Sequence, residues 1–385
     1  MKIAIVHDWL DTWGGSEKVL AELIDMFPAS DLFAVVDFLA PAARSRIKRE
    51  SIRTTFIQHL PLARRHFRKY LLLMPLAVEQ LDMQGYDLVI SSCHAVSKAV
   101  LTGPDQLHIC LCYSPPRYAW DMQTQYLRES GLDRGIGGWL ARKSLQSLRI
   151  ADLRASAGVD IFVAISRYVS RRIEKCYRRD STVIYPPVDI PPVDIPPMAP
   201  DAGRGADYVT VSRLVPYKRV DLLVEAFRSL PDRTLHVVGD GTGLNRLRSI
   251  AGPNVILHGN VADAERDRLL DSARAFIFAA EEDFGIAPIE AQARGVPVIA
   301  FARGGTAETI RGLDHRAPTG VHFERQDAES IAQAVRIFES AADRITPAAC
   351  RANAERFATP RFREQFGALV QTAWIEFERE RMPPP

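Results

Sequence analysis

The sequence has few cysteines, and their spacing gives no support for disulfides or a zinc site. The five are Cys93, Cys110, Cys112, Cys176 and Cys350. Their number is odd and no two of them form a CxxC pair, whereas disulfide frameworks and zinc sites usually show even counts or CxxC spacing. We therefore expect a protein of the reducing cytoplasm, with Cys110 and Cys112 as small buried strand residues.

Long hydrophobic runs are also missing. The stretch Leu71–Val78 is apolar, but it is far shorter than the roughly 20 residues that a membrane-spanning helix needs. The first residues, Met1–Asp8, become polar too soon for the apolar core of a signal peptide. The sequence therefore predicts neither a transmembrane helix nor a secretory leader.

Charge of one sign is scarce in the chain as a whole, since 49 Lys and Arg face 47 Asp and Glu, a net charge of +2. One segment departs from this balance: Arg44–Lys69 holds nine basic residues with Glu50 as its only acid, and Leu71–Met74 follows. Basic residues beside an apolar surface are typical of peripheral proteins on an anionic membrane. A solvated helix face is the alternative, and no recognisable nucleic-acid-binding module accompanies the charge.

The length of 385 residues favours two domains. Short apolar strand candidates alternate with helical patterns in both halves, which predicts parallel, doubly wound α/β sheets. In the first half the candidates are Lys2–Val6, Leu32–Val36, Leu88–Ser91, His108–Cys112 and Ile161–Ile165. In the second half they are Tyr208–Val211, Leu235–Val238, Val255–His258, Ala275–Phe278 and Val296–Phe301.

A proline-rich stretch separates the two halves. It repeats Pro-Pro-Val-Asp-Ile in tandem, at Pro186–Ile190 and Pro191–Ile195, and proline at this density is stiff and non-helical. We expect an N-terminal domain over residues 1–185, a linker over 186–206, a C-terminal domain over 207–358 and a final helix over 359–385. Apolar residues at helical spacing in Arg361–Glu380 indicate that this helix packs on another part of the protein.

An acidic loop in the second half is the strongest functional signal. Glu282 and Glu290 follow the predicted strand Ala275–Phe278, with a Phe-Gly-Ile turn between them, and a helical segment Ile289–Ala293 comes next. Ligands of open α/β sheets bind at the carboxyl ends of the strands. Two carboxylates there suit the hydroxyls of a sugar, although the same pair in isolation also suits acid/base hydrolysis of a glycoside.

A basic loop occupies the corresponding place after the first strand of the same half. Arg213 and Lys218 lie between Tyr208–Val211 and the next helix, where two cations suit a diphosphate; a solvated loop is the alternative. The glycine-rich Val238–Gly243 also follows a strand, and we interpret it as a tight turn rather than a dinucleotide site.

These features together resemble the family of retaining, GT-B-fold glycosyltransferases called family 4 or group 1. The resemblance is densest over residues 209–310 and rests on five stretches: Ser212–Arg219, Gly259, Glu282–Glu290, Gly295–Val298 and Gly304–Glu308. The N-terminal Gly14–Lys18 resembles the same family's glycine loop. The resemblance implies two Rossmann-like domains that face a cleft, with the C-terminal helix crossing back to the N-terminal domain.

The resemblance implies donor-side roles for particular residues. Arg213 and Lys218 would stabilise the nucleotide diphosphate as a leaving group, Glu282 would contact the transferred sugar, and Glu290 would hold the ribose hydroxyls. The remaining donor-binding positions are the backbone at Gly15, Phe284, Gly285 and Ile286, together with Gly259 and Val261 near the base. No Asp-x-Asp motif is placed to require a metal, so we expect an enzyme with no metal and no cofactor.

The acceptor is expected in the first domain. A histidine commonly stands in the family at the position of Tyr113, so the role of this tyrosine is open, and His94 is an alternative polar contact or a helix cap. Arg117 and Asp121 are further acceptor-side candidates.

The stretches around Lys218 and Asp121 look most like mannosyltransferases. The implied reaction moves mannose from GDP-mannose to a glycan, expected to be a lipid-diphosphate-linked oligosaccharide of cell-surface polysaccharide synthesis, at the inner face of the cell membrane. A UDP-sugar donor, an epimerase or phosphorylase, and a non-enzymatic nucleotide-sugar-binding scaffold remain alternatives.

Overall fold

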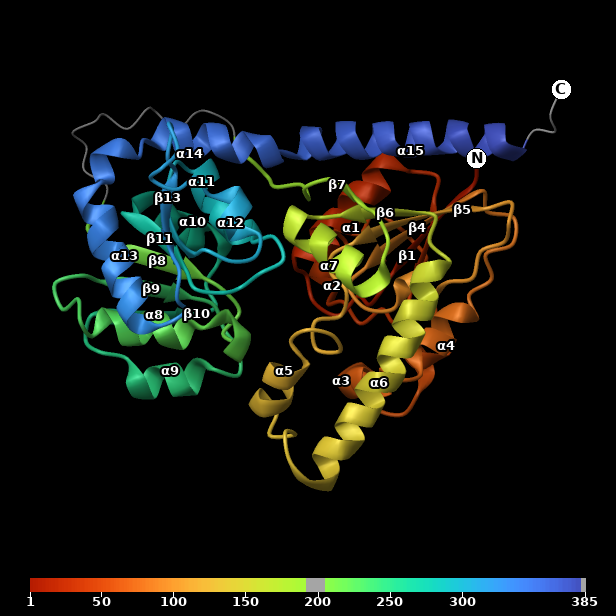
Figure 1. Ribbon diagram of the computed structural model, residues 1–385, viewed down its shortest axis with the longest axis horizontal. Helices are drawn as coiled ribbons and strands as arrows, with labels where there is room; N and C mark the ends of the chain where they lie inside the picture. The colour runs from red at the N-terminus through yellow and green to blue at the C-terminus, as the bar shows by residue number, and fades with distance from the viewer. Residues whose placement is uncertain (192–204, 382–385) are drawn as a thin grey trace. The chain divides into compact units, whose positions relative to one another are not determined.

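The computed structural model describes residues 1–191 and 205–381 (Figure 1). The chain forms two compact units: Met1–Pro187 with the chain from Phe362 onward, and Val188–Arg361. Most of the predicted linker, including all but Pro191 of the second Pro-Pro-Val-Asp-Ile copy, lies outside the described residues. Its first part is packed, because the buried Val188 donates its N–H to the Phe357 carbonyl at 2.9 Å.

The first unit is built on a seven-stranded parallel sheet in the order β3-β2-β1-β4-β5-β6-β7. Its strands are β1 Ile3–His7, β2 Asp31–Ala34, β3 Arg53–Thr54, β4 Leu88–Cys93, β5 Leu107–Cys112, β6 Ile161–Ala164 and β7 Thr182–Val183. The central strands β1, β4 and β5 are buried along their whole length. Apolar runs of this kind form parallel strands because helices cover both faces of the sheet.

Helices connect these strands. They are α1 Gly15–Met26, α2 Pro41–Arg44, α3 Ala63–His66, α4 Met74–Glu79, α5 Gln123–Glu129, α6 Gly135–Ala157 and α7 Arg167–Tyr177. The Ser166 hydroxyl caps α7 by accepting from the Val169 N–H at 3.0 Å. All five cysteines lie in described residues and none forms a disulfide.

The last helix, α15 Thr359–Arg381, packs against the first unit. The Phe366 ring meets Phe27 edge to face at 6.4 Å between centroids, and Arg363 donates to Glu22 at 2.7 Å. At the far end, Arg381 lies 2.7 Å from an Asp105 carboxylate oxygen. The predicted terminal helix is therefore present, and its apolar side covers α1.

The second unit holds a six-stranded parallel sheet in the order β10-β9-β8-β11-β12-β13. Its strands are β8 Tyr208–Val211, β9 Leu235–Val238, β10 Val255–Gly259, β11 Ala275–Phe278, β12 Val298–Phe301 and β13 Gly320–Phe323, and its helices are α8 Val220–Phe227, α9 Leu244–Ile250, α10 Asp263–Ser272, α11 Ile286–Ala293, α12 Thr306–Thr309, α13 Ala328–Ser340 and α14 Pro347–Ala354. Successive strand residues enter opposite cores: Ile277 packs with α8 and α13, whereas Phe276 packs with α10 and α11.

Both sheets reverse their direction of growth at one point. In the first unit the chain proceeds from β1 outward through β2 and β3, then returns to place β4 on the other side of β1. In the second unit β11 returns beside β8 in the same way. Ligands of doubly wound sheets bind outside the carboxyl ends of the strands at such a switch point, so the β1/β4 and β8/β11 ends are the places to examine.

Candidate functional site

A charge pair spans the switch point of the second unit. Lys218, in the loop after β8, places its Nζ 2.7 Å from Oε1 of Glu282, in the loop after β11. Their side chains are only 14% and 19% exposed. The structure therefore brings together the predicted cation and the predicted carboxylate at the carboxyl ends of adjacent strands.

The Glu282 loop is fixed by the loop after β12. The Gly305 N–H donates to the Glu282 carbonyl at 2.7 Å, and Glu282 forms a bridge with Gly304. Gly304 has a φ of +80°, and a Cβ there would lie 2.2 Å from the Glu282 carbonyl oxygen. Only glycine fits this approach, so the Gly304-Gly305 pair of the sequence pattern positions the Glu282 backbone.

Helix α11 begins earlier than predicted, at Ile286 rather than Ile289. Gly285, with a φ of +87°, turns the chain directly into the helix. The first N–H groups of α11 therefore come directly after the acidic loop, where helix termini leave donors without intrahelical partners. Glu290 is the fifth residue of α11 and lies in its second turn, while the Phe284 ring is buried against Phe357 at 5.6 Å.

The other donor-side predictions lie at varying distances from this pair along the sheet. Arg213 donates to the Tyr217 hydroxyl at 2.8 Å within the Lys218 loop. Gly259 ends the edge strand β10, which lies two strands away from β8, and Val261 follows two residues later. His258 is hydrogen-bonded to His236 of β9 at 2.8 Å, and burial together with His236 lowers its pKa.

The glycine-rich turn after β9 packs on the basic loop. The Leu214 N–H donates to the Asp240 carbonyl at 2.9 Å, and the Gly243 N–H donates back to the Leu214 carbonyl at 2.8 Å. These bonds hold the two loops together, in agreement with our interpretation of Val238–Gly243 as a tight turn.

A second charge pair spans the switch point of the first unit. Asp8, directly after β1, is fully buried, and its Oδ2 lies 3.0 Å from Nδ1 of His94, directly after β4. The Asp8 carboxylate also accepts four backbone N–H groups, from His94 (2.5 Å), Ala95 (2.9 Å), Val96 (2.7 Å) and Ser97 (2.7 Å). The His94 side chain stays 28% exposed, and its role as a polar contact of the acceptor stays a prediction.

The environment sets the charges of this pair. Burial by itself would raise the pKa of Asp8, but the charge and hydrogen bonds of His94 outweigh it, so the pKa is well below its usual range. Burial would likewise lower the pKa of His94, yet the Asp8 charge and hydrogen bond raise it. Asp8 is therefore ionised, and His94 holds its proton to higher pH than an ordinary histidine.

A chain of polar contacts connects the predicted Tyr113 to the end of β1 and to the glycine loop. The Tyr113 hydroxyl is 2.8 Å from Ser92 Oγ, which is 2.9 Å from Nδ1 of His7. His7 Nε2 lies 3.7 Å from Glu17, whose other carboxylate oxygen accepts from the Gly14 N–H at 2.9 Å. Gly15 is the first residue of α1, so the glycine loop, Tyr113 and the end of β1 form one polar network.

Arg117 and Asp121 belong to a different set of contacts. Asp121 forms an ion pair with Arg172 at 2.6 Å, and Arg117 contacts the Met122 sulfur at 3.7 Å. The structure thus brings His94 and Tyr113 close together, with ring centroids 6.3 Å apart, and places Asp121 against α7 instead.

His7, Asp8 and Glu17 were not among the predicted site residues. A detectable signal was present for two of them, because His7 and Asp8 stand directly where an apolar run at the start of the chain becomes polar. In a parallel sheet that position is the ligand-binding edge. Across residues 1–191 and 205–381, no group of three or more His, Cys, Asp and Glu side chains is placed to hold a metal ion.

We expect His94→Gln to reduce the pH dependence of stability. Folding raises the pKa of His94, so this residue contributes to the free energy of unfolding when the pH is below its ordinary pKa near 6.5. The contribution is lost as the pH rises through the pKa of the folded state. The expected contribution is about 1.4 kcal/mol for each unit of pKa shift. Melting temperatures of the wild type and H94Q should differ most near pH 6 and converge at alkaline pH. The exposed His59→Gln is the matched control, and a constant offset between wild type and H94Q would contradict the assignment.

Comparison with known proteins agrees with this geometry. Residues 201–357 match the family described as Glycosyl transferases group 1. They form a domain of that family, and the resemblance predicted from the sequence is confirmed over this range. A relative from Corynebacterium glutamicum, a GDP-mannose-dependent monoacylated alpha-(1-6)-phosphatidylinositol monomannoside mannosyltransferase, is 30% identical over 223 residues, which cover 51% of this chain and 56% of the relative. The chain thus aligns with about half the length of these curated mannosyltransferase relatives.

Solved structures extend the likeness to the whole chain at the level of the fold. Sucrose-phosphate synthase from Thermosynechococcus elongatus has a TM-score of 0.72 at 17% identity and covers 98% of this chain and 100% of its own. Anabaena HepE in complex with UDP has a TM-score of 0.67 at 18% identity, over 97% and 100%. The predicted α/β class, with two parallel sheets of the GT-B type, is confirmed.

Proposed function

We propose that this protein is a retaining glycosyltransferase that moves mannose from GDP-mannose to a glycan acceptor, a lipid-diphosphate-linked oligosaccharide of cell-surface polysaccharide synthesis. The observation that carries the proposal is the Lys218–Glu282 pair. It spans the switch point of a domain that matches Glycosyl transferases group 1. The name of the Corynebacterium relative supports mannose and GDP as the first choice.

The second unit would bind the donor. Lys218 and Arg213 would face the diphosphate, and Glu282 would accept hydrogen bonds from the sugar hydroxyls. Glu290 would hold the ribose. The first N–H groups of α11, after Gly285, would add donors to the phosphate oxygens.

The reaction breaks the bond between the anomeric carbon and the β-phosphate oxygen, and the electron pair stays on that oxygen. Lys218 and Arg213 would stabilise this charge as it develops, without help from a metal ion. The acceptor hydroxyl would attack from the same face, and its proton would pass to an oxygen of the departing diphosphate. The new bond joins the acceptor oxygen to the anomeric carbon with its configuration kept.

The first unit would bind the acceptor. His94, held by Asp8 at Nδ1, presents a partly exposed ring at the β1/β4 end, and its protonated form would suit the phosphate of a lipid diphosphate. Tyr113 would support the site through Ser92 and His7. Arg117 is the remaining acceptor-side candidate, and Asp121 would act through Arg172.

A thermal-shift panel with GDP, UDP, ADP and their sugars tests the donor assignment. A ligand that binds only the folded state raises the melting temperature. At a ligand concentration 100 times the Kd, it adds about 2.7 kcal/mol to the free energy of unfolding. We expect GDP-mannose and GDP to give the largest shifts. The complex of HepE with UDP makes a UDP-sugar the second candidate, and a shift with UDP alone would replace the GDP assignment.

A transfer assay tests the reaction itself. We expect no sugar turnover until a lipid-linked acceptor is added, and an α-linked product by NMR. Conversion of a nucleotide sugar without acceptor would indicate an epimerase, and consumption that requires phosphate would indicate a phosphorylase. Donor binding with no turnover on any acceptor would favour a nucleotide-sugar-binding scaffold at the membrane.

A further inference from the structure

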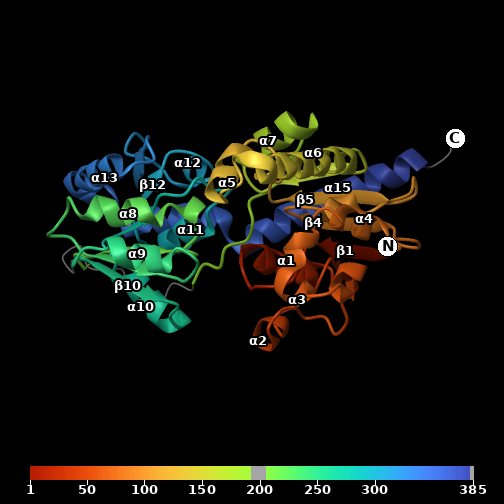
Figure 2. The ribbon, with the colours of Figure 1, turned by 90° about the horizontal axis from the view of Figure 1, so that it is seen from below.

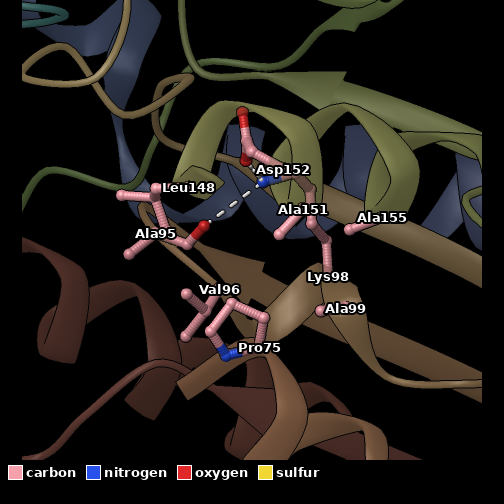
Figure 3. Close-up of a pocket in the computed structure, with 9 residues that line it drawn as sticks. All are labelled: Pro75, Ala95, Val96, Lys98, Ala99, Leu148, Ala151, Asp152 and Ala155. Atoms are coloured by element: carbon pink, nitrogen blue, oxygen red, sulfur yellow. Dashed lines mark hydrogen bonds and ion pairs between the residues drawn. The ribbon is translucent and has the colours of Figure 1, made fainter. Parts of the chain in front are cut away.

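Helix α6, Gly135–Ala157, is anchored to the first unit along one side only. On that side the buried Asp152 forms an ion pair with the buried Lys98 and accepts hydrogen bonds from Trp120 Nε1 and the Tyr177 hydroxyl, each at 2.8 Å. Figure 3 shows Asp152 and Lys98 beside a cavity lined also by Pro75 and Leu148. The cavity measures about 10 Å³, room for at most one water molecule, so the inner side of α6 is filled.

The outer side of α6 is apolar and exposed. Its large apolar side chains recur at helical spacing, so they share one face. They are Ile136 (81% exposed), Trp139 (64%), Leu140 (52%), Ile150 (64%) and Leu153 (47%). Single exposed apolar residues are ordinary on a protein surface, but a row along one helix is a patch that marks an interaction site.

The charged residues of α6 on and beside this face are basic. Lys143 and Arg154 lie on the face itself and Arg142 lies beside it, whereas Asp152, the only acid within α6, is buried. Arg154 is paired with Glu79 of α4. Long basic side chains of this kind extend their charged ends to the polar layer while their stems cover apolar surface. An apolar face with a cationic border is complementary to an anionic lipid surface.

Helix α4 adds further exposed apolar side chains near α6. It lies beside the second half of α6 (Figures 1 and 2), joined to it by an Arg154–Glu79 ion pair at 2.8 Å. Three more leucines are exposed on and just before α4: Leu72 (50%), Leu73 (43%) and Leu76 (50%).

The basic segment Arg44–Lys69, which the sequence predicted as a membrane face, is partly neutralised. Three of its cations form ion pairs at distances of 2.9 Å or less: Arg44 with Asp37, Lys48 with Asp25, and Arg68 with Asp11.

We propose that the outer face of α6, together with Leu72, Leu73 and Leu76, is the surface through which this protein binds an anionic lipid bilayer. The helix would lie in the plane of the interface, with Ile136 and Trp139 among the acyl chains. No helix in the described part of the chain is both long enough and apolar enough to cross a bilayer. A second copy of the chain fits this face poorly, because a two-fold pairing would oppose Lys143 and Arg142 to their equivalents.

Vesicle flotation tests this surface on the full chain, independently of transfer activity. We expect the wild type to float with vesicles of phosphatidylglycerol in phosphatidylcholine. The double variant I136S/W139S should bind at least about tenfold less, because each large apolar side chain contributes roughly 1.5–3 kcal/mol when buried. Ile375→Ser, which removes an isoleucine that is 57% exposed from α15, is the matched control and should float like the wild type.

A charge variant separates the two parts of the interaction. R142E/K143E should bind anionic vesicles about tenfold less or weaker still, since each basic residue near an anionic surface is worth about 1 kcal/mol. High salt should weaken the binding of the wild type to anionic vesicles until it approaches the binding of this variant. Circular dichroism should show all variants folded, because the changed side chains are exposed.

Three results would overturn the proposal. One is wild-type protein that does not float with anionic vesicles, and another is I136S/W139S that floats as well as the wild type. The third is a dimer in analytical ultracentrifugation that I136S/W139S abolishes while flotation is unchanged, which would assign the face to a second copy of the chain.

Discussion

Lys218→Ala is expected to lower the rate of sugar transfer by about 10²–10³-fold, the usual effect of removing one group that stabilises developing charge. The folded state should lose far less. The pair with Glu282 is partly exposed, so we expect a loss on the order of 1 kcal/mol and a fall in melting temperature of a few degrees. Steady-state transfer kinetics and a thermal melt of the same preparation measure both.

A double variant separates two explanations of that loss. If Lys218 serves only to neutralise Glu282, K218A/E282Q should regain activity, because the carboxylate is then absent as well. If Lys218 stabilises the leaving group, the double variant should remain as slow as K218A or slower. Arg325→Ala removes an exposed cation that pairs with Asp327 and Glu329 and is the control that should keep full activity.

Asp8→Asn is expected to be the most destabilising conservative substitution in the first unit. Two carboxylate oxygens accept four backbone N–H groups, whereas an amide offers one oxygen and turns an NH₂ toward the remaining donors. A buried donor without an acceptor costs about 1–3 kcal/mol. With two such donors, we expect the melting temperature to fall on the order of 10 °C.

The pH profile gives an independent measurement of the same substitution. The pKa of Asp8 is depressed by folding, so its contribution is present above the ordinary value near 3.8 and is lost as the pH falls below it. Wild-type protein should lose stability there more steeply than D8N. Asp105→Asn, which removes a largely exposed partner of Arg381, is the control. Its free energy of unfolding should stay within about 1 kcal/mol of the wild-type value. Equal melting of D8N and wild type would contradict the role of the Asp8 carboxylate.

The second unit was the more predictable one because its strands are short and apolar, and recognisable basic, glycine-rich and acidic loops follow β8, β9 and β11. Strands β8, β9 and β11 have the predicted bounds. The start of α11 was placed three residues late, because the sequence does not reveal that Gly285 adopts a left-handed conformation. The two-residue strands β3 and β7 were missed, since so few residues carry no periodicity.

Helix α6 was missed for a different reason. Its apolar residues lie mostly on the exposed face, and its inner side includes Gly138 and Asp152, so the usual pattern of a helix with a buried apolar face is reversed. The sequence identified Lys218 and Glu282 because both stand in recognisable loops. It did not identify the partner of His94, because Asp8 is 86 residues away and meets it only through the β1–β4 pairing.

The discontinuous first unit has a consequence for synthesis of the chain. Residues Val188–Arg361 form an uninterrupted unit, whereas the unit that starts at Met1 includes α15 from Phe362 onward. On the ribosome, the N-terminal half must therefore wait, with its contacts to Phe366 and Arg363 unmade, until the last residues emerge. The unit Val188–Arg361 is therefore completely synthesised before the first unit is. A chain that terminates before Phe362 would leave the Phe27 side of α1 uncovered and prone to aggregation.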